Sequence, residues 1–175
     1  MDEIASELGI SKKTLYQWVP SKDELVKKVL ESFTEKIKSR SLERAEEAPN
    51  AIDEIFMLLE TSGSEISQVK SNVVNDLQKY HHEAWELMRQ FQYDFTCKTI
   101  ERNLERGRAE GLYREDFDIS IVARIHLASA FNLFDQNLFP VETFAPDRLF
   151  QEHLLYYLHG IASSKGRQYL KKKLS

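Results

Sequence analysis

Apolar residues recur three and four positions apart along almost the whole chain, which is the spacing of one face of an α-helix. The pattern predicts helices over residues 4–8, 12–18, 21–47, 52–59, 69–80, 82–110, 119–138 and 146–160. Proline and glycine mark their ends, as at Pro49, Gly111 and Pro140. No segment alternates apolar and polar residues with the period of a strand. The sequence therefore predicts an all-α fold, with the tail "GRQYLKKKL" as a frayed, solvated end.

Two short helices are predicted to meet at Gly9, near the start of the chain. Glycine adopts the left-handed backbone conformation of a tight corner without steric cost. Ser11 is a good N-cap for the second helix. Ala5 is small where the two helices would cross, and Leu15 can face the first helix. A helix, a glycine turn and a second helix in this arrangement form a helix-turn-helix.

The outward face of the second helix carries side chains that suit DNA. Lysine binds phosphate or guanine, glutamine pairs with adenine, and threonine offers a methyl and a hydroxyl group. These side chains are Lys12, Lys13, Thr14, Tyr16 and Gln17. The alternative interpretation of the same residues is an ordinary solvated face, because exposed lysines are common.

The helix predicted over residues 21–47 carries an unfavourable positive charge in its first turn. Ser21 and Glu24 form a capping box. Lys22 is a cation in the first turn, where the helix dipole favours anions. A phosphate bound at this N-terminus would explain the lysine.

Residues 1–26, "MDEIASELGISKKTLYQWVPSKDELV", resemble the DNA-binding end of the tetracycline-repressor (TetR) family of bacterial transcription regulators. The matching positions are Ile4, Ala5, Gly9, Ile10, Ser11, Thr14, Leu15, Tyr16, Val19, Lys22 and Leu25. The resemblance implies a ligand-responsive regulator, most simply a repressor, that binds operator DNA as a homodimer. It implies a helix-turn-helix part over residues 1–44 and a larger helical ligand-binding and dimerisation domain over residues 45–175.

The resemblance assigns the DNA contacts to Ser11, Lys12, Lys13, Thr14, Tyr16, Gln17, Trp18 and Lys22. Trp18 stands where the family more often has Tyr or His, and it can pack against a sugar-phosphate or lie half buried under the next helix. In the family another helix precedes Ile4, so we expect a longer natural protein and incomplete cover for Ile4 and Leu8. The alternative function is a helical module that senses a ligand or partner and has lost DNA binding.

Two later helices are predicted to pair with a second copy. The stretch "ISIVARIHLASAFNLF" (residues 119–134) is apolar nearly all round, so it needs cover on every side. Small residues such as Ala123 and Ala128 allow a partner helix to come close. The stretch "LFQEHLLYYLHG" (149–160) adds further apolar residues. The family pairs its last two long helices in a four-helix interface, and the alternative is that both form the core of a monomer.

A small-molecule site is predicted among the central helices. Its candidate lining residues are Phe56, Leu59, Trp85, Met88, Phe91, Phe95 and Phe131. Such residues also form plain cores, and the resemblance is what favours a mostly apolar pocket. Candidate polar handles are Tyr80, His81, His82 and Asn132, although we interpret the His81–His82 pair as a satisfied or solvent-facing corner.

Composition narrows the function classes. The formal charge of the 175-residue chain is −4, so DNA binding must rest on a local basic surface. Cys97 is the single cysteine, which excludes an internal disulfide and suits a cytoplasmic location. No apolar run approaches the roughly 20 residues of a membrane span. No nucleophile–base motif or metal-ligand spacing is present, with His126, His153 and His159 scattered, so we expect no enzyme, metal or cofactor.

Overall fold

The computed structural model describes residues 1–66 and 73–174, with all their side chains except those of 59–66 and 75. The elements are α1 (Asp2–Glu7), α2 (Lys12–Trp18), α3 (Lys22–Glu47), α4 (Ala51–Ile66), α5 (Val73–Tyr80), α6 (His82–Phe91), a π-helical segment η1 (Gln92–Cys97), α7 (Lys98–Ala109), α8 (Ile119–Asn132), α9 (Pro146–Ile161) and α10 (Ser164–Leu174). No strand occurs in these ranges, which confirms the all-α prediction. Nor does any described helix have both the length and the apolar composition to cross a membrane.

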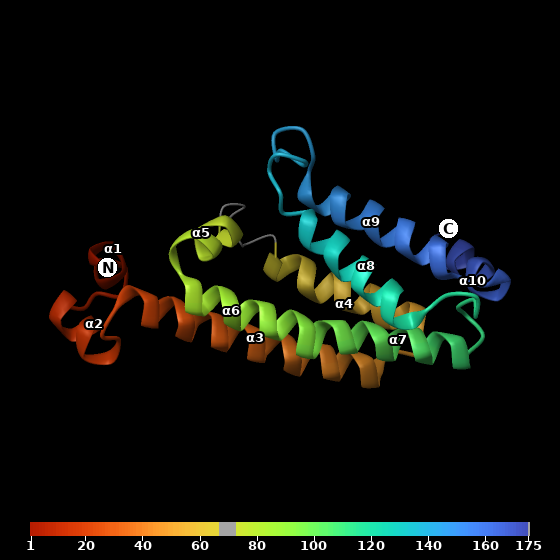
Figure 1. Cartoon of the computed structure of the whole chain (residues 1–175), viewed down its shortest axis with the longest axis horizontal. Helices are drawn as coiled ribbons and strands as arrows, with labels where there is room; N and C mark the ends of the chain where they lie inside the picture. Colours follow the sequence, from red (N-terminus) through yellow and green to blue (C-terminus); the bar gives the residue numbers. More distant parts are fainter. Residues whose placement is uncertain (67–72, 175) are drawn as a thin grey trace.

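The molecule is elongated, with the α1–α2 pair at one end (Figure 1). Helix α3 runs from that pair into the rest of the protein and lies beside α6 and α7 (Figure 1). Helix α4 contacts α3, α7 and α9, helix α8 contacts η1, α7 and α9, and α10 lies at the far end (Figure 1). We call everything from α4 onward the body.

The buried residues form two clusters. A small one joins Ala5, Leu15 and Val19, each no more than 5% exposed, with Leu25 packed beside them. A larger one fills the body around fully buried residues such as Leu104 and Leu158. Helix α3 therefore connects the two clusters. Its first turn packs against the small cluster, and the remainder packs against the body.

Local capping follows the sequence predictions closely. The Ser11 Oγ accepts a hydrogen bond from the Thr14 N–H at 3.0 Å, and the Ser21 Oγ accepts one from the Glu24 N–H at 3.1 Å. Gly9 has a φ of +63°, the left-handed conformation expected for the corner between α1 and α2. The predicted bounds of α2 are confirmed.

Four predictions about the helices were wrong. The helix expected over 82–110 is interrupted by η1, and α8 ends at Asn132 because the Asp135 side chain and backbone accept hydrogen bonds from a following turn. Val29, placed on the apolar stripe of α3, is 61% exposed. Helix α4 continues past residue 59 to Ile66. The expected start of the fifth helix, at 69–72, lies outside the described residues.

A fifth prediction was also wrong, because the tail forms α10 rather than a frayed end. Leu170 is fully buried. The Tyr169 hydroxyl donates to Asp53 Oδ2 at 2.5 Å, and Lys173 Nζ lies 2.7 Å from Asp53 Oδ1. Burial raises the pKa of Asp53, but the bonds from Lys173 and Tyr169 outweigh it and leave the pKa below its ordinary value.

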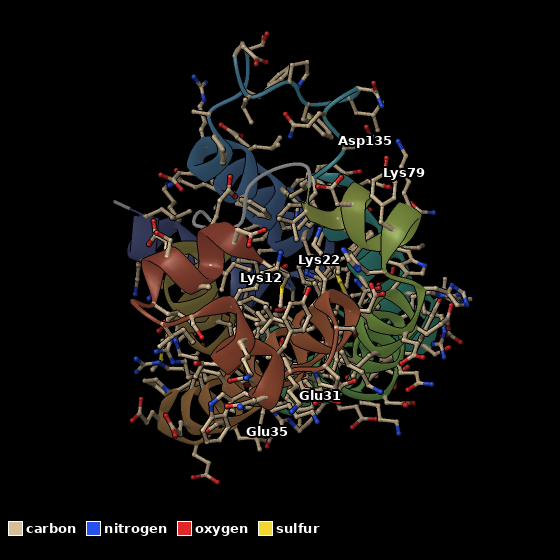
Figure 2. All side chains as sticks on the ribbon, turned by 90° about the vertical axis from the view of Figure 1, so that its left-hand side faces the viewer. Lys12, Lys22, Glu31, Glu35, Lys79 and Asp135 are labelled. Carbon is tan, nitrogen blue, oxygen red and sulfur yellow. The ribbon has the colours of Figure 1, made fainter. Side chains whose placement is uncertain are left out.

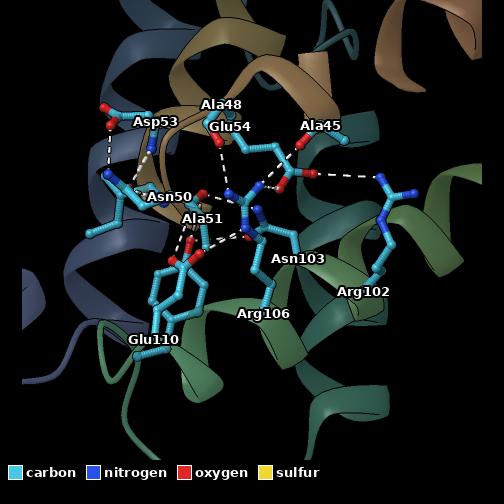
Figure 3. A network of polar contacts seen from close by, with 12 residues as sticks. Ala45, Ala48, Asn50, Ala51, Asp53, Glu54, Arg102, Asn103, Arg106 and Glu110 are labelled. Carbon is cyan, nitrogen blue, oxygen red and sulfur yellow. Dashed lines mark hydrogen bonds and ion pairs between the residues drawn. The ribbon is translucent and has the colours of Figure 1, made fainter. Parts of the chain in front are cut away.

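A polar network fixes the corner between α3 and α4 on α7 (Figure 3). The Arg106 guanidinium donates to the carbonyl oxygens of Ala45 and Ala48, at 3.1 and 2.7 Å, where the end of α3 leaves them without helical partners. It also contacts Glu54 at 3.0 Å and Glu110 at 2.8 Å. Because Glu54 is only 1% exposed, this pair holds the body end of α3 in place.

Candidate DNA-binding helix and body pocket

Helix α2 is buried on one face and open on the other. Leu15 and Val19 point into the small cluster, at 4% and 5% exposure. The opposite face carries Lys12, Lys13, Tyr16, Gln17 and Trp18, all exposed. Figure 2 looks onto this end of the molecule and shows Lys12 and Lys22 on it. Trp18 is 76% exposed, so the half-buried placement considered for it does not occur.

Three of the predicted DNA-contacting residues, Ser11, Lys12 and Thr14, form contacts with neighbouring residues of α1 and α2. The Ser11 and Thr14 hydroxyls lie 2.7 Å apart, and Thr14 is half buried. Lys12 Nζ forms an ion pair with Asp2 Oδ2 at 2.9 Å, and this hydrogen bond lowers the pKa of Asp2. Exposed ion pairs contribute little to stability. Lys12 can therefore exchange the Asp2 carboxylate for a phosphate at small cost.

Apolar side chains at this end are incompletely covered. Ile4 is 37% exposed and Leu8 is 62% exposed, as the sequence led us to expect. Ile10, expected to fill the corner between the helices, is also 37% exposed.

A pocket of about 250 Å³ lies inside the body, between α3, α4, η1, α7, α8 and α9. It is lined by Ile37, Ser41, Ile55, Leu58, Phe95, Thr96, Thr99, Ile100, Asn103, His126, Leu127, Ala130, Phe150, His153, Leu154 and Tyr157. None of these is Asp, Glu, Lys or Arg. The pocket thus has an apolar wall with a few uncharged polar groups, which is the usual composition of a small-molecule site.

Of the six predicted ligand-binding residues whose side chains the structure describes, only Phe95 lines this pocket. Trp85 packs against Phe131, with ring centroids 6.1 Å apart, and Phe91 stacks on Phe95 at 5.4 Å. Phe56 lies under the Lys173 ammonium group, 5.0 Å from it. Met88 is half buried on α6, and the side chain of Leu59 lies outside the described residues.

Three pocket residues that the sequence analysis did not select form an aromatic stack. The His126 ring lies 3.7 Å from the Tyr157 ring and 5.0 Å from the His153 ring, between centroids. Burial lowers the pKa of His126 to about 3 and also lowers that of His153, so both imidazoles are neutral at pH 7. Burial likewise raises the pKa of Tyr157. The sequence alone indicates two scattered histidines, because only the packing of α8 on α9 brings His126 and His153 together.

The predicted polar handles lie elsewhere. His82, Tyr80 and Asn132 are exposed, and Tyr80 is 70% exposed. His81 Nδ1 contacts Asp23 Oδ1 at 2.5 Å, which ties the start of α6 to the first turn of α3. In the described part of the chain, no three His, Cys, Asp or Glu residues are grouped to hold a metal ion.

Comparison with known proteins places this architecture. No family model matches the chain. A stretch of 86 residues is 34% identical to the uncharacterized HTH-type transcriptional regulator YvaF of Bacillus subtilis, covering 49% of this chain and 45% of that protein. The chain thus spans less than half the length of that relative. The HTH-type transcriptional repressor KstR2 of Mycolicibacterium smegmatis is 27% identical over 94% of this chain and 81% of its own length.

Solved structures share the fold. The ketosteroid transcriptional regulator KstR2 of Mycobacterium tuberculosis superimposes with a TM-score of 0.66 at 20% identity, over 93% of this chain and 84% of its own. A complex of SmeT with triclosan superimposes with a TM-score of 0.56 at 16% identity, over 92% and 80%.

The exposed α2, its glycine corner and the all-helical body form the helix-turn-helix architecture for which both relatives, transcriptional regulators, are named. Their agreement with the chain supports the resemblance of residues 1–26 to the TetR family, and the solved structures show that the chain shares their fold.

Proposed function

We propose that this chain is a ligand-responsive transcriptional repressor that binds operator DNA as a homodimer and changes its DNA affinity when a small molecule enters the body pocket. One observation carries the DNA-binding part of the proposal. Helix α2 buries only Leu15 of its seven residues and presents Lys13, Tyr16 and Gln17 outward. The naming of the KstR2 relative as a repressor supports the direction of control.

The apolar surface of α8 and α9 supports a dimer. Ile121 and Ile125 are one helical turn apart on α8 and are 56% and 60% exposed. Tyr156 on the neighbouring α9 is 82% exposed. A second copy that covers these side chains gives the dimer two α2 helices. A helix-turn-helix protein needs two such helices to bind two DNA half-sites one helical turn apart.

The body offers a route from the pocket to α2. Segment η1 and helix α7 supply Phe95, Thr96 and Thr99 to the pocket wall. The opposite end of the same helical rod touches the start of α3 through His81–Asp23 and through Lys27–Glu83, the latter at 3.4 Å. A ligand with different affinities for two positions of this rod would shift α2, and coupling of roughly 1–3 kcal/mol changes operator affinity by about 5–150-fold.

The test uses an operator selected by the wild-type protein from a pool of random DNA. We expect Lys13→Ala and Gln17→Ala each to weaken binding to that operator in a gel shift, by roughly 1–3 kcal/mol for a base contact. Lys98→Ala, an exposed lysine on α7, is the control and should bind normally. Lys22→Ala should weaken all sequences alike and reduce the salt slope by about one.

Specific binding that survives both α2 substitutions would exclude α2 as the reading helix. If the wild type selects no sequence from the pool, the alternative function, a sensing module without DNA binding, explains the chain better.

A further inference from the structure

Two polar atoms of the body pocket have no partner in the protein. Within the described residues, neither the Nδ1 of His126 nor the hydroxyl of Tyr157 makes a hydrogen bond, although both atoms are buried. Tyr157 is only 8% exposed, and both residues line the pocket. A buried polar group without a partner costs free energy. A bound molecule that pairs with these atoms recovers that free energy on binding.

The His126 Nδ1 and the Tyr157 hydroxyl can together donate and accept hydrogen bonds. A phenol hydroxyl donates one hydrogen bond and accepts others, and one nitrogen of a neutral imidazole accepts while the other donates. They belong to stacked rings from two helices, α8 and α9, with ring centroids 3.7 Å apart, so both residues lie at the same part of the pocket wall. A single hydroxyl group of a ligand, which both donates and accepts, matches this pair.

The rest of the wall excludes charge and limits size. None of the described lining residues is Asp, Glu, Lys or Arg, so among them an ionised ligand group would be buried without a counter-charge, which is costly. An apolar cavity of roughly 150 Å³ holds benzene, so the pocket, at about 250 Å³, suits a molecule of roughly ten non-hydrogen atoms.

We propose that the body pocket binds an uncharged, largely apolar molecule of about this size that carries one hydroxyl group, held by Tyr157 and His126. The inference rests on the proposed function in assigning the effector site to this pocket. It adds the chemical class of the effector and names the two residues that recognise its polar group.

Three naphthalene derivatives test the proposal with the whole chain in calorimetric titrations. 2-Naphthol carries the hydroxyl, 2-methylnaphthalene replaces it with a methyl group of similar size, and 2-naphthoate carries a charge. We expect the wild type to bind 2-naphthol roughly fivefold or more tightly than 2-methylnaphthalene, as one hydrogen bond provides. 2-Naphthoate should bind at least about tenfold more weakly than 2-naphthol, because burying its charge is unfavourable.

Tyr157→Phe removes only the hydroxyl and should abolish the preference for 2-naphthol while leaving 2-methylnaphthalene binding unchanged. Tyr156→Phe is the control, because Tyr156 is 82% exposed, and it should bind all three probes as the wild type does. Ala130→Leu fills the pocket and should weaken both uncharged probes. Without ligand, Tyr157→Phe should melt at a higher temperature than the wild type, because it no longer buries an unpaired hydroxyl.

The proposal is overturned if the preference for 2-naphthol survives in Tyr157→Phe, if 2-naphthoate binds as tightly, or if neither uncharged probe binds. A lower melting temperature for Tyr157→Phe also counts against it. These outcomes are separate from the DNA experiments. Probe binding that depends on Tyr157 in a chain that selects no DNA would overturn only the proposed function, and the reverse result would overturn only this inference.

Discussion

The Nδ1 of His81 and the Oδ1 of Asp23 lie 2.5 Å apart, and they join the start of the α6–η1–α7 rod to the first turn of α3. Asp23 follows α2 after a short turn, while the other part of the rod forms a wall of the pocket. Lys27 and Glu83 add a second, longer contact at the same place, 3.4 Å between Nζ and Oε2. This junction is where the body meets the segment that carries α2, the proposed DNA-reading helix.

We therefore expect His81→Ala to uncouple ligand from DNA without destroying either site. The ligand-induced change in operator affinity should fall roughly two- to fivefold, which corresponds to the ~0.5–1 kcal/mol of a partly exposed polar pair. Arg148→Ala, which alters an ion pair on the surface of α9, should leave the response unchanged. Fluorescence anisotropy of labelled operator, with and without ligand, measures it. An unaltered response in His81→Ala would show that the signal takes another route.

Arg106 should be far more important for stability than its neighbour Arg102. Arg106→Ala leaves Glu54 buried beside Arg102 alone, 3.6 Å away, and frees the carbonyls of Ala45 and Ala48. Breaking a buried pair in this way costs about 3–5 kcal/mol of unfolding free energy. Arg102→Ala removes a contact that is half exposed and should cost less than about 1 kcal/mol.

Urea denaturation followed by circular dichroism measures both variants. Equal losses for Arg102→Ala and Arg106→Ala would contradict the assignment of Arg106 as the anchor of the α3–α4 corner.

The buried imidazole of His126 makes stability depend on pH. Burial lowers its pKa from 6.5 to about 3, so the unfolded chain takes up a proton below pH 6.5 that the folded chain refuses. The unfolding free energy therefore falls as pH drops from 6.5 towards 3, by about 2 kcal/mol between pH 7 and pH 5. The lowered pKa of His153 acts in the same direction.

His126→Phe keeps an aromatic ring in the stack and should flatten this part of the pH profile, as measured by thermal melting at several pH values. His159→Phe, at an exposed histidine of the same protein, should leave the slope as it is. A His126→Phe profile parallel to the wild type would show that other groups dominate the acid sensitivity.

A charge on the exposed face of α8 should separate the proposed dimer. Ile125→Glu places a carboxylate in the interface, and like charges from two copies oppose association. Val29→Glu is a matched control, because Val29 on α3 is 61% exposed and Ile125 is 60% exposed. Sedimentation velocity should show the Ile125 variant as a monomer and the Val29 variant with the wild-type profile. A dimer that persists in Ile125→Glu would place the interface elsewhere.

Structural features that depend only on neighbouring residues could be predicted from the sequence. The N-caps at Ser11 and Ser21 and the positive φ of Gly9 need only a few adjacent residues, and the structure has all three. The same holds for the bounds of α2. Capping and glycine geometry are local, so a single sequence is enough to predict them.

Features that depend on distant contacts were not predictable in this way. Helix α10 is fixed by Tyr169 and Lys173 reaching Asp53, more than a hundred residues earlier. The aromatic stack in the pocket joins His126 to His153 and Tyr157 across two helices. A single sequence does not reveal such pairings, so the residues chosen for the pocket by size and apolarity were mostly half-buried residues of α6 and α8 that lie outside it.

The π-helical segment η1 also sets the rotational phase of the rod. A π turn holds one residue more than an α turn, and each residue of an α-helix advances by about 100°. In a regular helix Thr99 and Asn103 would continue the line of Trp85 and Met88, but the additional residue turns α7 relative to α6, and both residues lie in the pocket wall, which Trp85 and Met88 do not line. Deleting one residue between 92 and 97 would rotate that wall away from its cavity, so natural relatives that share this pocket should conserve the number of residues here more strictly than their identities.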